Sequence, residues 1–321
     1  MDLAVAAGPI YEPGLDELLR AGISSGALSF TASARECVAD AAAVFLAVGT
    51  PSLPNGDIDL SQLDGAARSV APHLKSGAVV IVKSTVSAGT SSRIREVIAE
   101  TRRSLDFSVA SNPEFLREGS AIDDFMCPDR IVFGADDPRA SATLREIYAP
   151  LAKTGVPVLA TTTTNAELIK HAANAFLALK IGFINDVSDL CEQAGADVMA
   201  VAEGIGLDRR IGQNFLTPGP GFGGSCFPKD TRAFAATGRR LGSRQGLVEL
   251  LIERNEMRKR RLAERIISEA GLRHGARVAV LGLAFKAGTD DVRESPALPI
   301  IAHLQRSGMV VRAHDPQAAQ N

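Results

Sequence analysis

Residues 78–85 read AVVIVKST, and this stretch decides the fold class. Its first five residues are apolar and rich in valine, which is typical of a strand buried on both faces of a sheet. The polar triplet Lys83-Ser84-Thr85 follows at once and marks the end of the strand. The stretch therefore predicts a central strand of a parallel sheet with polar side chains at its carboxyl end.

The same pattern recurs on both sides of this stretch. Helical segments at Ser91–Arg103 and Ala140–Leu151 separate the predicted strands. The other predicted strands are Ala43–Val48, Phe107–Ala110, Arg130–Phe133 and Val156–Ala160. Alternating strands and helices are typical of α/β proteins. We therefore expect residues 1–160 to form a Rossmann-like, doubly wound parallel sheet.

Polar side chains follow three of these strands. The segments are Gly49-Thr50-Pro51, Lys83-Ser84-Thr85 and Ser111-Asn112-Pro113-Glu114. Ligands of open α/β sheets bind outside the carboxyl ends of the strands. The three segments therefore outline a candidate site on one rim of the sheet, although each of them could equally be an ordinary polar turn.

The alternation stops after residue 160. Thr164-Asn165-Ala166-Glu167 fits a capping box and predicts the start of a long helix, in which Lys170 and Asn174 are four residues apart and share a face. A second long helix is predicted at Gly246–Glu269. Residues 161–270 are therefore expected to form a central helical domain.

The last segment returns to strands. It contains an apolar run at Arg277–Leu281, a helix from about Pro296 to Arg306 and a second run at Val310–Ala313. Residues 271–321 therefore resemble the start of a second Rossmann-like α/β domain. Two strands and one helix bury little surface by themselves, so we expect the remainder to be missing or supplied by a partner.

Composition narrows the function classes. Apolar residues make up 45%, charged residues 22%, and the net charge is −2, so no strong attraction to nucleic acid is expected. The cysteines lack zinc-site or disulfide spacing and suit a reducing compartment; they are Cys37, Cys127, Cys191 and Cys226. No signal peptide or membrane span is apparent. We expect a cytoplasmic protein without a metal site.

A glycine-rich segment carries the most chemistry. Gly219, Gly221 and Gly224 match G-x-G-x-x-G, but no strand precedes them, so we interpret them as letting the backbone approach a ligand closely. Cys226 then stands just before Pro228, which suits the first turn of a helix. A helix N-terminus favours a thiolate, which can attack a carbonyl carbon. On spacing alone, a buried inert cysteine is the alternative.

Longer segments carry a family resemblance. They follow one another over residues 11–316 and are Tyr11–Leu15, Val48–Pro51, Lys83–Val86, Ser111–Gly119, Glu167–Lys170, Asn174–Ala178, Gly223–Asp230, Leu281–Lys286 and Arg293–Pro296. In this order they resemble the UDP-glucose 6-dehydrogenase family of nucleotide-sugar dehydrogenases.

The resemblance implies a four-electron oxidation of a sugar C6 alcohol to an acid, with NAD⁺ removing two hydrides in turn. Cys226 would form a thiohemiacetal and then a thioester, which water cleaves. Lys170 would stabilise the oxyanion, and Asn174 would hold the same oxygen or a water. Asp230 would orient or activate water.

The resemblance also assigns binding roles. Thr85 and Glu118 would lie beside the nicotinamide and a water, and Glu114 would do acid–base work or contact substrate. Thr50 and Arg293 would contact NAD, and Arg210 would reach the substrate of a neighbouring subunit. The nucleotide-sugar pocket would include Phe115, Leu116, Phe215, Leu216, Gly223, Phe285 and Lys286. A homodimer formed through the central helices is implied, with Leu247, Leu250, Leu251 and Ile252 on the second long helix.

Two questions remain open at this level. Ser225 before Cys226 and Phe227 after it favour UDP-glucose over UDP-N-acetylmannosamine and GDP-mannose as substrate. The family's glycine-rich first βαβ unit and most of its UDP-binding domain have no counterpart in the sequence. The alternative is therefore a catalytically impaired relative that acts as a binding or dimerisation module. We expect residues 1–321 alone to bind NAD⁺ and UDP-glucose weakly and to turn over slowly or not at all.

Overall fold

A computed structural model describes residues 11–319 of the chain. The chain divides into two compact units, residues 1–171 and 172–321, and each is described by itself. The long helix α8 (Thr163–Ala194) spans the division. The prediction of three domains with boundaries after residues 160 and 270 stays a prediction.

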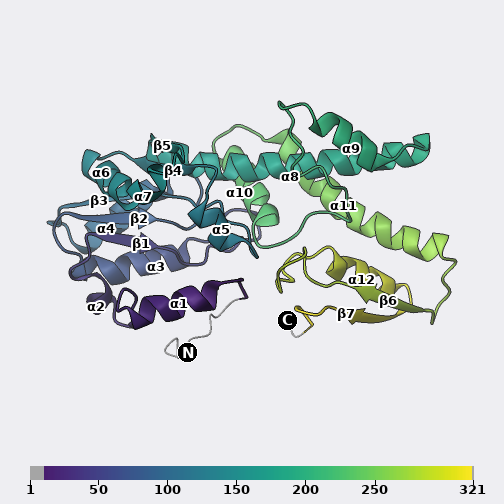
Figure 1. Ribbon diagram of the computed structural model, residues 1–321, viewed down its shortest axis with the longest axis horizontal. Coiled ribbons are helices and arrows are strands. Elements are labelled where there is room, and N and C mark those ends of the chain that lie inside the picture. The colour runs from purple at the N-terminus through teal and green to yellow at the C-terminus, as the bar shows by residue number, and fades with distance from the viewer. Residues whose placement is uncertain (1–10, 320–321) are drawn as a thin grey trace. The chain divides into compact units, whose positions relative to one another are not determined.

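The first unit is built on one five-stranded sheet with the order β1-β2-β3-β4-β5 (Figure 1). Its strands are β1 (Ala43–Leu46), β2 (Ala78–Val82), β3 (Phe107–Ser111), β4 (Ile131–Ala135) and β5 (Val158–Thr161). Its helices are α1 (Leu15–Ser24), α2 (Ala34–Val38), α3 (Ser61–Val70), α4 (Thr90–Thr101), α5 (Ala121–Met126), α6 (Pro138–Ile147) and α7 (Ala149–Ala152), with a 3₁₀ turn at Ala71–His73.

Helices cover both faces of this sheet. All five residues of β2 are buried. Val80 and Val82 pack with Leu63 of α3 and Ile94 of α4, whereas Ile81 belongs to a second core cluster with residues of α6. Alternate residues of a strand point to opposite faces, so this division confirms that the apolar run belongs to a sheet covered on both sides.

The direction of the last two strands corrects the prediction of a parallel sheet. β1, β2 and β3 are parallel, but β4 runs antiparallel to β3 with only Ala110↔Ala135 and Ser111↔Gly134 paired. β5 is parallel to β4. The connection between β3 and β4, residues 112–130, contains only the six-residue helix α5, which at about 1.5 Å per residue does not carry the chain back along the sheet. The chain therefore passes beyond the end of β3, and β4 returns.

The second unit contains the remainder of α8 and a small sheet. Its other elements are α9 (Val198–Gly206), α10 (Phe227–Arg240), α11 (Gly246–Glu269), β6 (Arg277–Leu281), α12 (Ala297–Arg306) and β7 (Val310–His314). β6 and β7 are parallel neighbours, and α12 packs with α11 through a cluster that includes Ala263 and Leu304. The predicted α/β unit at the end of the chain is thus present.

Candidate active site

The predicted rim of the sheet exists, because hydrogen bonds join the ends of its three parallel strands. The Thr50 hydroxyl after β1 donates to the Thr85 carbonyl after β2 over 2.9 Å. The Lys83 ammonium donates to Asn112 Oδ1 after β3 over 3.2 Å. These segments are therefore parts of one polar surface.

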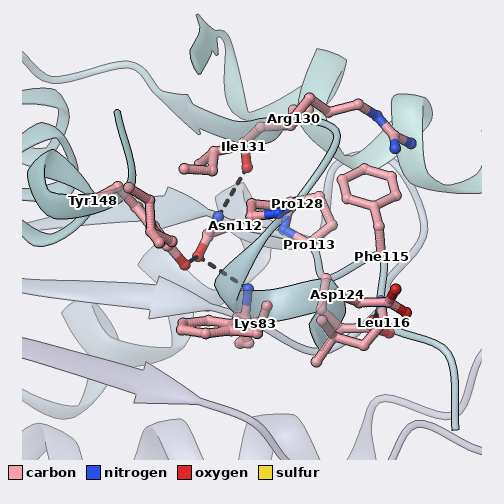
Figure 2. Close-up of a pocket in the computed structure, with 14 residues that line it drawn as sticks. Lys83, Asn112, Pro113, Phe115, Leu116, Asp124, Pro128, Arg130, Ile131 and Tyr148 are labelled. Carbon is pink, nitrogen blue, oxygen red and sulfur yellow. Dashed lines mark hydrogen bonds between the residues drawn. The ribbon is translucent and has the colours of Figure 1, made fainter. Parts of the chain in front are cut away.

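Lys83 and Asn112 line a small pocket together with several apolar side chains (Figure 2). Tyr148 Oη donates to Asn112 Oδ1 over 2.5 Å, and Asn112 Nδ2 donates to the Val132 carbonyl over 2.8 Å. Burial lowers the pKa of Lys83 to about 8, with Lys170 acting in the same direction and Glu114 opposing it. The cavity of about 40 Å³ holds a few waters at most, which is too little for a larger ligand. We therefore interpret its residues as support for the rim.

Glu114 and Lys170 form an ion pair beside this rim. Lys170 is only 3% exposed, and its Nζ lies 3.4 Å from Glu114 Oε1. The backbone N–H of Leu116 donates to Glu114 Oε2 over 2.6 Å, so both carboxylate oxygens are held. The Lys170 ammonium also lies 5.3 Å from the centre of the Phe115 ring. The structure thus brings together four residues that the resemblance singled out.

Glu118 lies on a loop that is held by a carboxylate from a distant part of the sequence. The carboxylate of Glu12 accepts hydrogen bonds of 2.7 Å from the backbone N–H groups of Gly119 and Ala121. Nothing in the sequence around Glu12 indicates that its carboxylate holds a loop more than a hundred residues away.

Glu167 corrects the predicted capping box. Its carboxylate accepts from the backbone N–H of Gly89 and from the N–H and hydroxyl of Ser91, each over 2.7 Å. It therefore serves the N-terminus of α4, where unpaired N–H groups need acceptors. Burial raises the pKa of this carboxyl, and the three hydrogen bonds oppose the rise. At α8 itself, Thr162 Oγ1 accepts from the N–H of Asn165 over 3.3 Å.

In the second unit, the predicted helix after Cys226 is present as α10. Cys226 occupies its N-cap position and Pro228 lies in its first turn. The thiol is half-buried, and its sulfur lies 3.6 Å from the Ser225 hydroxyl. The N-terminal end of a helix favours a negative charge, which suits a reactive thiolate.

Asp230 lies one turn along α10 and is 1% exposed. Its carboxylate accepts from Asn174 Nδ2 over 2.6 Å and from the Lys229 ammonium over 2.8 Å. An ammonium and an amide thus satisfy this buried carboxylate from two sides. The structure therefore couples Asn174 to Asp230, a link that the sequence did not indicate.

Aromatic rings pack behind the Cys226 segment. The Phe227 ring lies 5.9 Å from that of Phe215 and 6.3 Å from that of Phe222. Phe215 has a φ of 65°, a left-handed conformation that is rare for a residue with a side chain. Leu216, the next residue, is buried. Strained backbone of this kind persists where the surrounding packing holds it.

Two glycines of this segment approach the chain itself, whereas the expected approach of the glycine-rich backbone to a ligand stays a prediction. A side chain at Gly223 would clash with the Glu294 carbonyl, and one at Gly224 would reach within 2.7 Å of the Phe285 ring. Gly224 also has a φ of 84°. These glycines therefore place Cys226 next to the loop that carries Phe285.

The remaining charged candidates are found on exposed segments. The Arg293 guanidinium donates to the Asp291 carboxylate over 2.8 to 3.0 Å, and Lys286 Nζ lies 5.6 Å from the Phe285 ring. The side chain of Arg210 is 89% exposed and pairs with Asp208 at 2.6 Å. Their assigned contacts with NAD, substrate and a neighbouring subunit stay predictions.

Asp315 holds the loop that precedes Phe285 and Lys286. Its carboxylate accepts four backbone hydrogen bonds of 2.7 to 3.0 Å from Leu283, Ala284, Gln317 and Ala318. These bonds hold the pKa of Asp315 well below its ordinary value of 3.8. They therefore stabilise the folded state above that value, and this contribution disappears as the pH falls through the lower pKa of the folded protein.

We expect Asp315→Asn to lower the melting temperature at neutral pH and to flatten its decrease below pH 3.8. The asparagine amide cannot match a carboxylate as an acceptor of four N–H groups. Thermal melting followed by circular dichroism from pH 2 to 7 measures both effects. Equal melting curves for the two proteins at neutral pH would contradict the role given to Asp315.

The described part of the chain offers neither a cluster of metal ligands nor a membrane-spanning helix. Among residues 11–319, no three His, Cys, Asp or Glu side chains gather closely enough to hold a metal ion. Over the same part of the chain, every helix is too short or too polar to cross a membrane.

The predicted site residues divide between the two units. Thr50, Thr85, Glu114, Phe115, Leu116, Glu118 and Lys170 belong to the first. Asn174, Arg210, Phe215, Leu216, Gly223, Cys226, Asp230, Phe285, Lys286 and Arg293 belong to the second. Helix α8 carries members of both sets, Lys170 and Asn174, four residues apart.

Comparison with protein families gives three consecutive matches. They belong to the UDP-glucose/GDP-mannose dehydrogenase family: its NAD binding domain matches residues 2–152, its central domain residues 164–257 and its UDP binding domain residues 279–321.

Individual relatives match nearly the whole chain. A UDP-glucose 6-dehydrogenase of Rhizobium meliloti is 49% identical over 318 residues, which cover 98% of this chain and 72% of the relative. One of Pseudomonas aeruginosa is 45% identical, covering 97% and 70%. Among solved structures, a UDP-glucose dehydrogenase of Pyrobaculum islandicum superposes with a TM-score of 0.94 at 45% identity, covering 98% of this chain and 73% of that one.

Proposed function

The chain belongs to the UDP-glucose/GDP-mannose dehydrogenase family, and we propose on this premise that it oxidises UDP-glucose to UDP-glucuronate with NAD⁺ as the hydride acceptor. The observation that carries the proposal is the 49% identity with a UDP-glucose 6-dehydrogenase over 318 residues. The polar rim, the cysteine at a helix start and two buried charged groups are what such chemistry requires.

The first unit fits a dinucleotide. The carboxyl edge of parallel strands is where open α/β sheets bind nucleotides, and Thr50 and Thr85 hold that edge together. When bound there, NAD⁺ accepts a hydride from the sugar carbon in each oxidation. We assign Thr50, Thr85, Glu118 and Arg293 to its binding.

Cys226 is the proposed nucleophile. After the first oxidation its thiolate attacks the aldehyde carbon, a carbon–sulfur bond forms, and the carbonyl oxygen takes up a proton to give a thiohemiacetal. The second oxidation of this adduct leaves a thioester. Water then attacks the acyl carbon, the carbon–sulfur bond breaks, and the acid and the free thiol are released.

Lys170 is the proposed electrostatic partner of the reacting oxygen. Its ammonium is almost fully buried, so water screens its charge little, and it lies on the rim beside Glu114. Glu114 accepts a proton or contacts the substrate in this scheme. The hydrogen-bonded arrangement fixes the position of both groups before any substrate arrives.

Asp230 and Asn174 are proposed to handle the water of thioester hydrolysis. Asp230 accepts a hydrogen bond from Lys229 and lies one turn after Cys226. The Asn174 amide is fixed by its bond to Asp230, which leaves its carbonyl oxygen available for another donor. The pocket for the nucleotide sugar is assigned to Phe115, Leu116, Phe215, Leu216, Gly223, Phe285 and Lys286, with Arg210 reaching a neighbouring subunit.

Substrate choice tests the proposal. We expect the purified chain to give the highest kcat/KM with UDP-glucose, because Ser225 and Phe227 flank Cys226 as in the UDP-glucose branch. The assay follows NADH formation at 340 nm with UDP-glucose, GDP-mannose and UDP-N-acetylmannosamine. A clear preference for GDP-mannose or UDP-N-acetylmannosamine would move the chain to another branch of its family.

We also propose that the protein is a homodimer in a reducing, cytoplasmic compartment. All four cysteines are free thiols, which suits such a compartment. A groove of about 350 Å³ lies between α8 and α11. Its rim includes Leu247, Leu250 and Phe183, which are 74%, 51% and 58% exposed. Aspartates of α8 and arginines of α11 line the same groove and pair with one another within one copy, so the exposed apolar rim is what a second copy would cover.

We expect Leu250→Glu to dissociate this dimer, because a carboxylate would be buried between two copies without a partner. Leu241→Glu serves as the control, since Leu241 is 64% exposed but lies outside the groove. Sedimentation velocity at micromolar concentration should show dimers for the unchanged protein and the control and monomers for Leu250→Glu. A well-folded monomer of the unchanged protein would refute the dimer.

A further inference from the structure

Asn255 of α11 binds the segment that leads to Cys226. We call residues 217–226 the Cys226 loop. Asn255 Oδ1 accepts from the backbone N–H of Phe222 over 2.8 Å, and its Nδ2 donates to the carbonyl of the same residue over 3.1 Å. Asn255 is only 7% exposed. The Asn255 side-chain amide therefore satisfies both the backbone N–H and the carbonyl of Phe222, and this contact is buried away from water.

The loop lies directly against this side chain. A Cβ at Gly221 would lie 2.9 Å from Asn255 Oδ1, and Gly221 has a φ of 131°. Only glycine fits both the backbone conformation and the close approach. Gly221 therefore allows the close approach of the loop through which Asn255 binds it.

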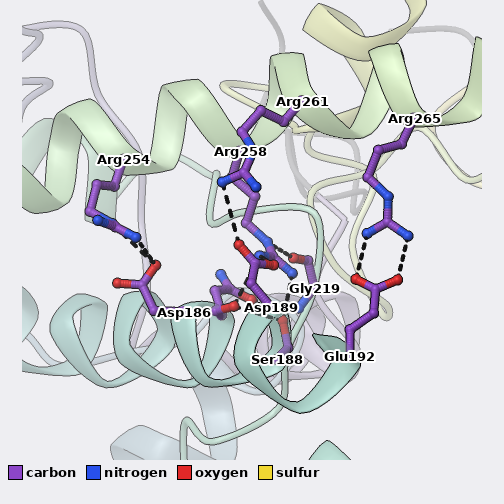
Figure 3. A network of polar contacts seen from close by, with 10 residues as sticks. Asp186, Ser188, Asp189, Glu192, Gly219, Arg254, Arg258, Arg261 and Arg265 are labelled. Atoms are coloured by element: carbon purple, nitrogen blue, oxygen red, sulfur yellow. Dashed lines mark hydrogen bonds and ion pairs between the residues drawn. The ribbon is translucent and has the colours of Figure 1, made fainter. Parts of the chain in front are cut away.

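A second anchor holds the loop three residues earlier (Figure 3). The Nε of Arg258 donates to the Gly219 carbonyl over 2.6 Å. The N–H of Gly219 donates to Asn185 Oδ1 of α8 over 2.8 Å. Gly219 is therefore bonded on both sides, once to each of the two long helices.

Arg258 is itself fixed by α8. Its guanidinium donates to the Asp189 carboxylate over 2.8 Å, to the Asn185 carbonyl over 3.0 Å and to the Ser188 hydroxyl over 3.0 Å. These contacts use the planar fork of the guanidinium, which a lysine cannot reproduce. The neighbouring pairs Arg254–Asp186 and Arg265–Glu192 join the same helices without touching the loop.

The anchors connect to Cys226 through packed rings. The Phe222 ring meets the Phe227 ring edge to face with centres 6.3 Å apart, and Phe227 follows Cys226 as the first residue of α10. A displacement of Phe222 therefore reaches the N-cap position of α10, because packed side chains transmit shifts instead of absorbing them.

We propose that Asn255 and Arg258 are positioning residues that fix the Cys226 thiol at the N-terminus of α10. The inference rests on the proposed function, since it names what holds the nucleophile of that reaction. Neither side chain needs to touch substrate or cofactor for this role. This role explains why Asn255 and Arg258 of α11 form hydrogen bonds with the backbone of the glycine-rich Cys226 loop.

Alkylation of the thiol tests the proposal without any substrate. The variants are Asn255→Leu and Arg258→Met, with Asn255→Asp and Arg258→Lys as milder second variants, and circular dichroism checks their folding. Iodoacetamide labelling resolved by peptide mass spectrometry gives the rate at each cysteine. We expect the rate at Cys226 to fall about tenfold, because the thiol loses its place at the helix end, while exposed Cys127 reacts unchanged.

Steady-state kinetics gives the second readout. We expect kcat to fall by about 10- to 100-fold in Arg258→Met, as misplacement of a reacting group by about 1 Å does, with the KM for NAD⁺ within about twofold of its normal value. Arg258→Lys should not restore kcat. The matched control is Arg265→Met, which removes the Arg265–Glu192 ion pair between the same two helices. This variant should leave both the Cys226 labelling rate and kcat unchanged.

Two results would overturn the positioning role. One is a Cys226 labelling rate that stays the same or rises in both folded variants. The other is a loss in Arg265→Met equal to that in Arg258→Met, since it would assign the effect to general weakening of the helix pair. If the unchanged protein fails to oxidise UDP-glucose, the proposed function fails, whereas the labelling rates still decide the positioning role.

Discussion

Cys226→Ser should abolish the formation of UDP-glucuronate. Serine lacks the nucleophilicity of a thiolate, so the thioester does not form. Water then has no acyl-enzyme to hydrolyse to the acid. We expect the rate of acid formation to fall on the order of a thousandfold or more, in line with the loss of a nucleophile in other enzymes. Chromatographic detection of UDP-glucuronate after incubation with NAD⁺ and UDP-glucose measures it.

The fold should survive this substitution, because replacing one sulfur by oxygen changes little volume. Cys191→Ser is the matched control, since Cys191 is a buried cysteine of the second unit outside any disulfide and has no assigned role. Acid formation by Cys226→Ser at the normal rate, with a normal melting curve, would place the nucleophile elsewhere. Cys226 should also react with alkylating agents before the other cysteines do.

Lys170→Met should lower kcat by about 100- to 1000-fold, the usual effect of removing one group that stabilises an oxyanion. Methionine keeps most of the volume of the lysine stem inside the protein but removes the charge that pairs with Glu114. Because Leu116 still donates to Glu114, the carboxylate retains one of its bonds. Stopped-flow or steady-state NADH formation measures kcat.

A surface substitution provides the comparison for Lys170. Lys153→Met removes the same charge from an exposed position outside the rim and should change kcat by less than about twofold. A kcat for Lys170→Met within about threefold of the normal value would contradict the electrostatic role. Similar losses in both variants would instead indicate a general effect of net charge.

Elements that are specified by their own local sequence can be predicted from the sequence alone. The bounds predicted for β2, β6 and α11 are those observed, because an unbroken apolar run or a long amphipathic pattern specifies them locally. Sequence reasoning also placed the three polar strand ends on one rim, since parallel strands share a carboxyl edge.

What sequence reasoning missed depends on contacts between distant segments. The reversal at β4 depends on the end of the sheet from which the segment 112–130 re-enters it, which apolar patterning does not report. Glu167 had a local partner available and bonds the start of α4 instead. Asn255 and Arg258 resemble ordinary polar residues of an exposed helix, and only the folded chain brings the Cys226 loop against them.

The ratio of NADH formed to UDP-glucuronate formed tests the central claim most directly. A complete reaction with limiting UDP-glucose is followed at 340 nm, and the acid is then measured by chromatography. Two oxidations through one thioester predict two NADH for each UDP-glucuronate and no free aldehyde. One NADH for each sugar, with an aldehyde as the product, or no NADH at all, would contradict the proposal that this chain carries out the four-electron oxidation.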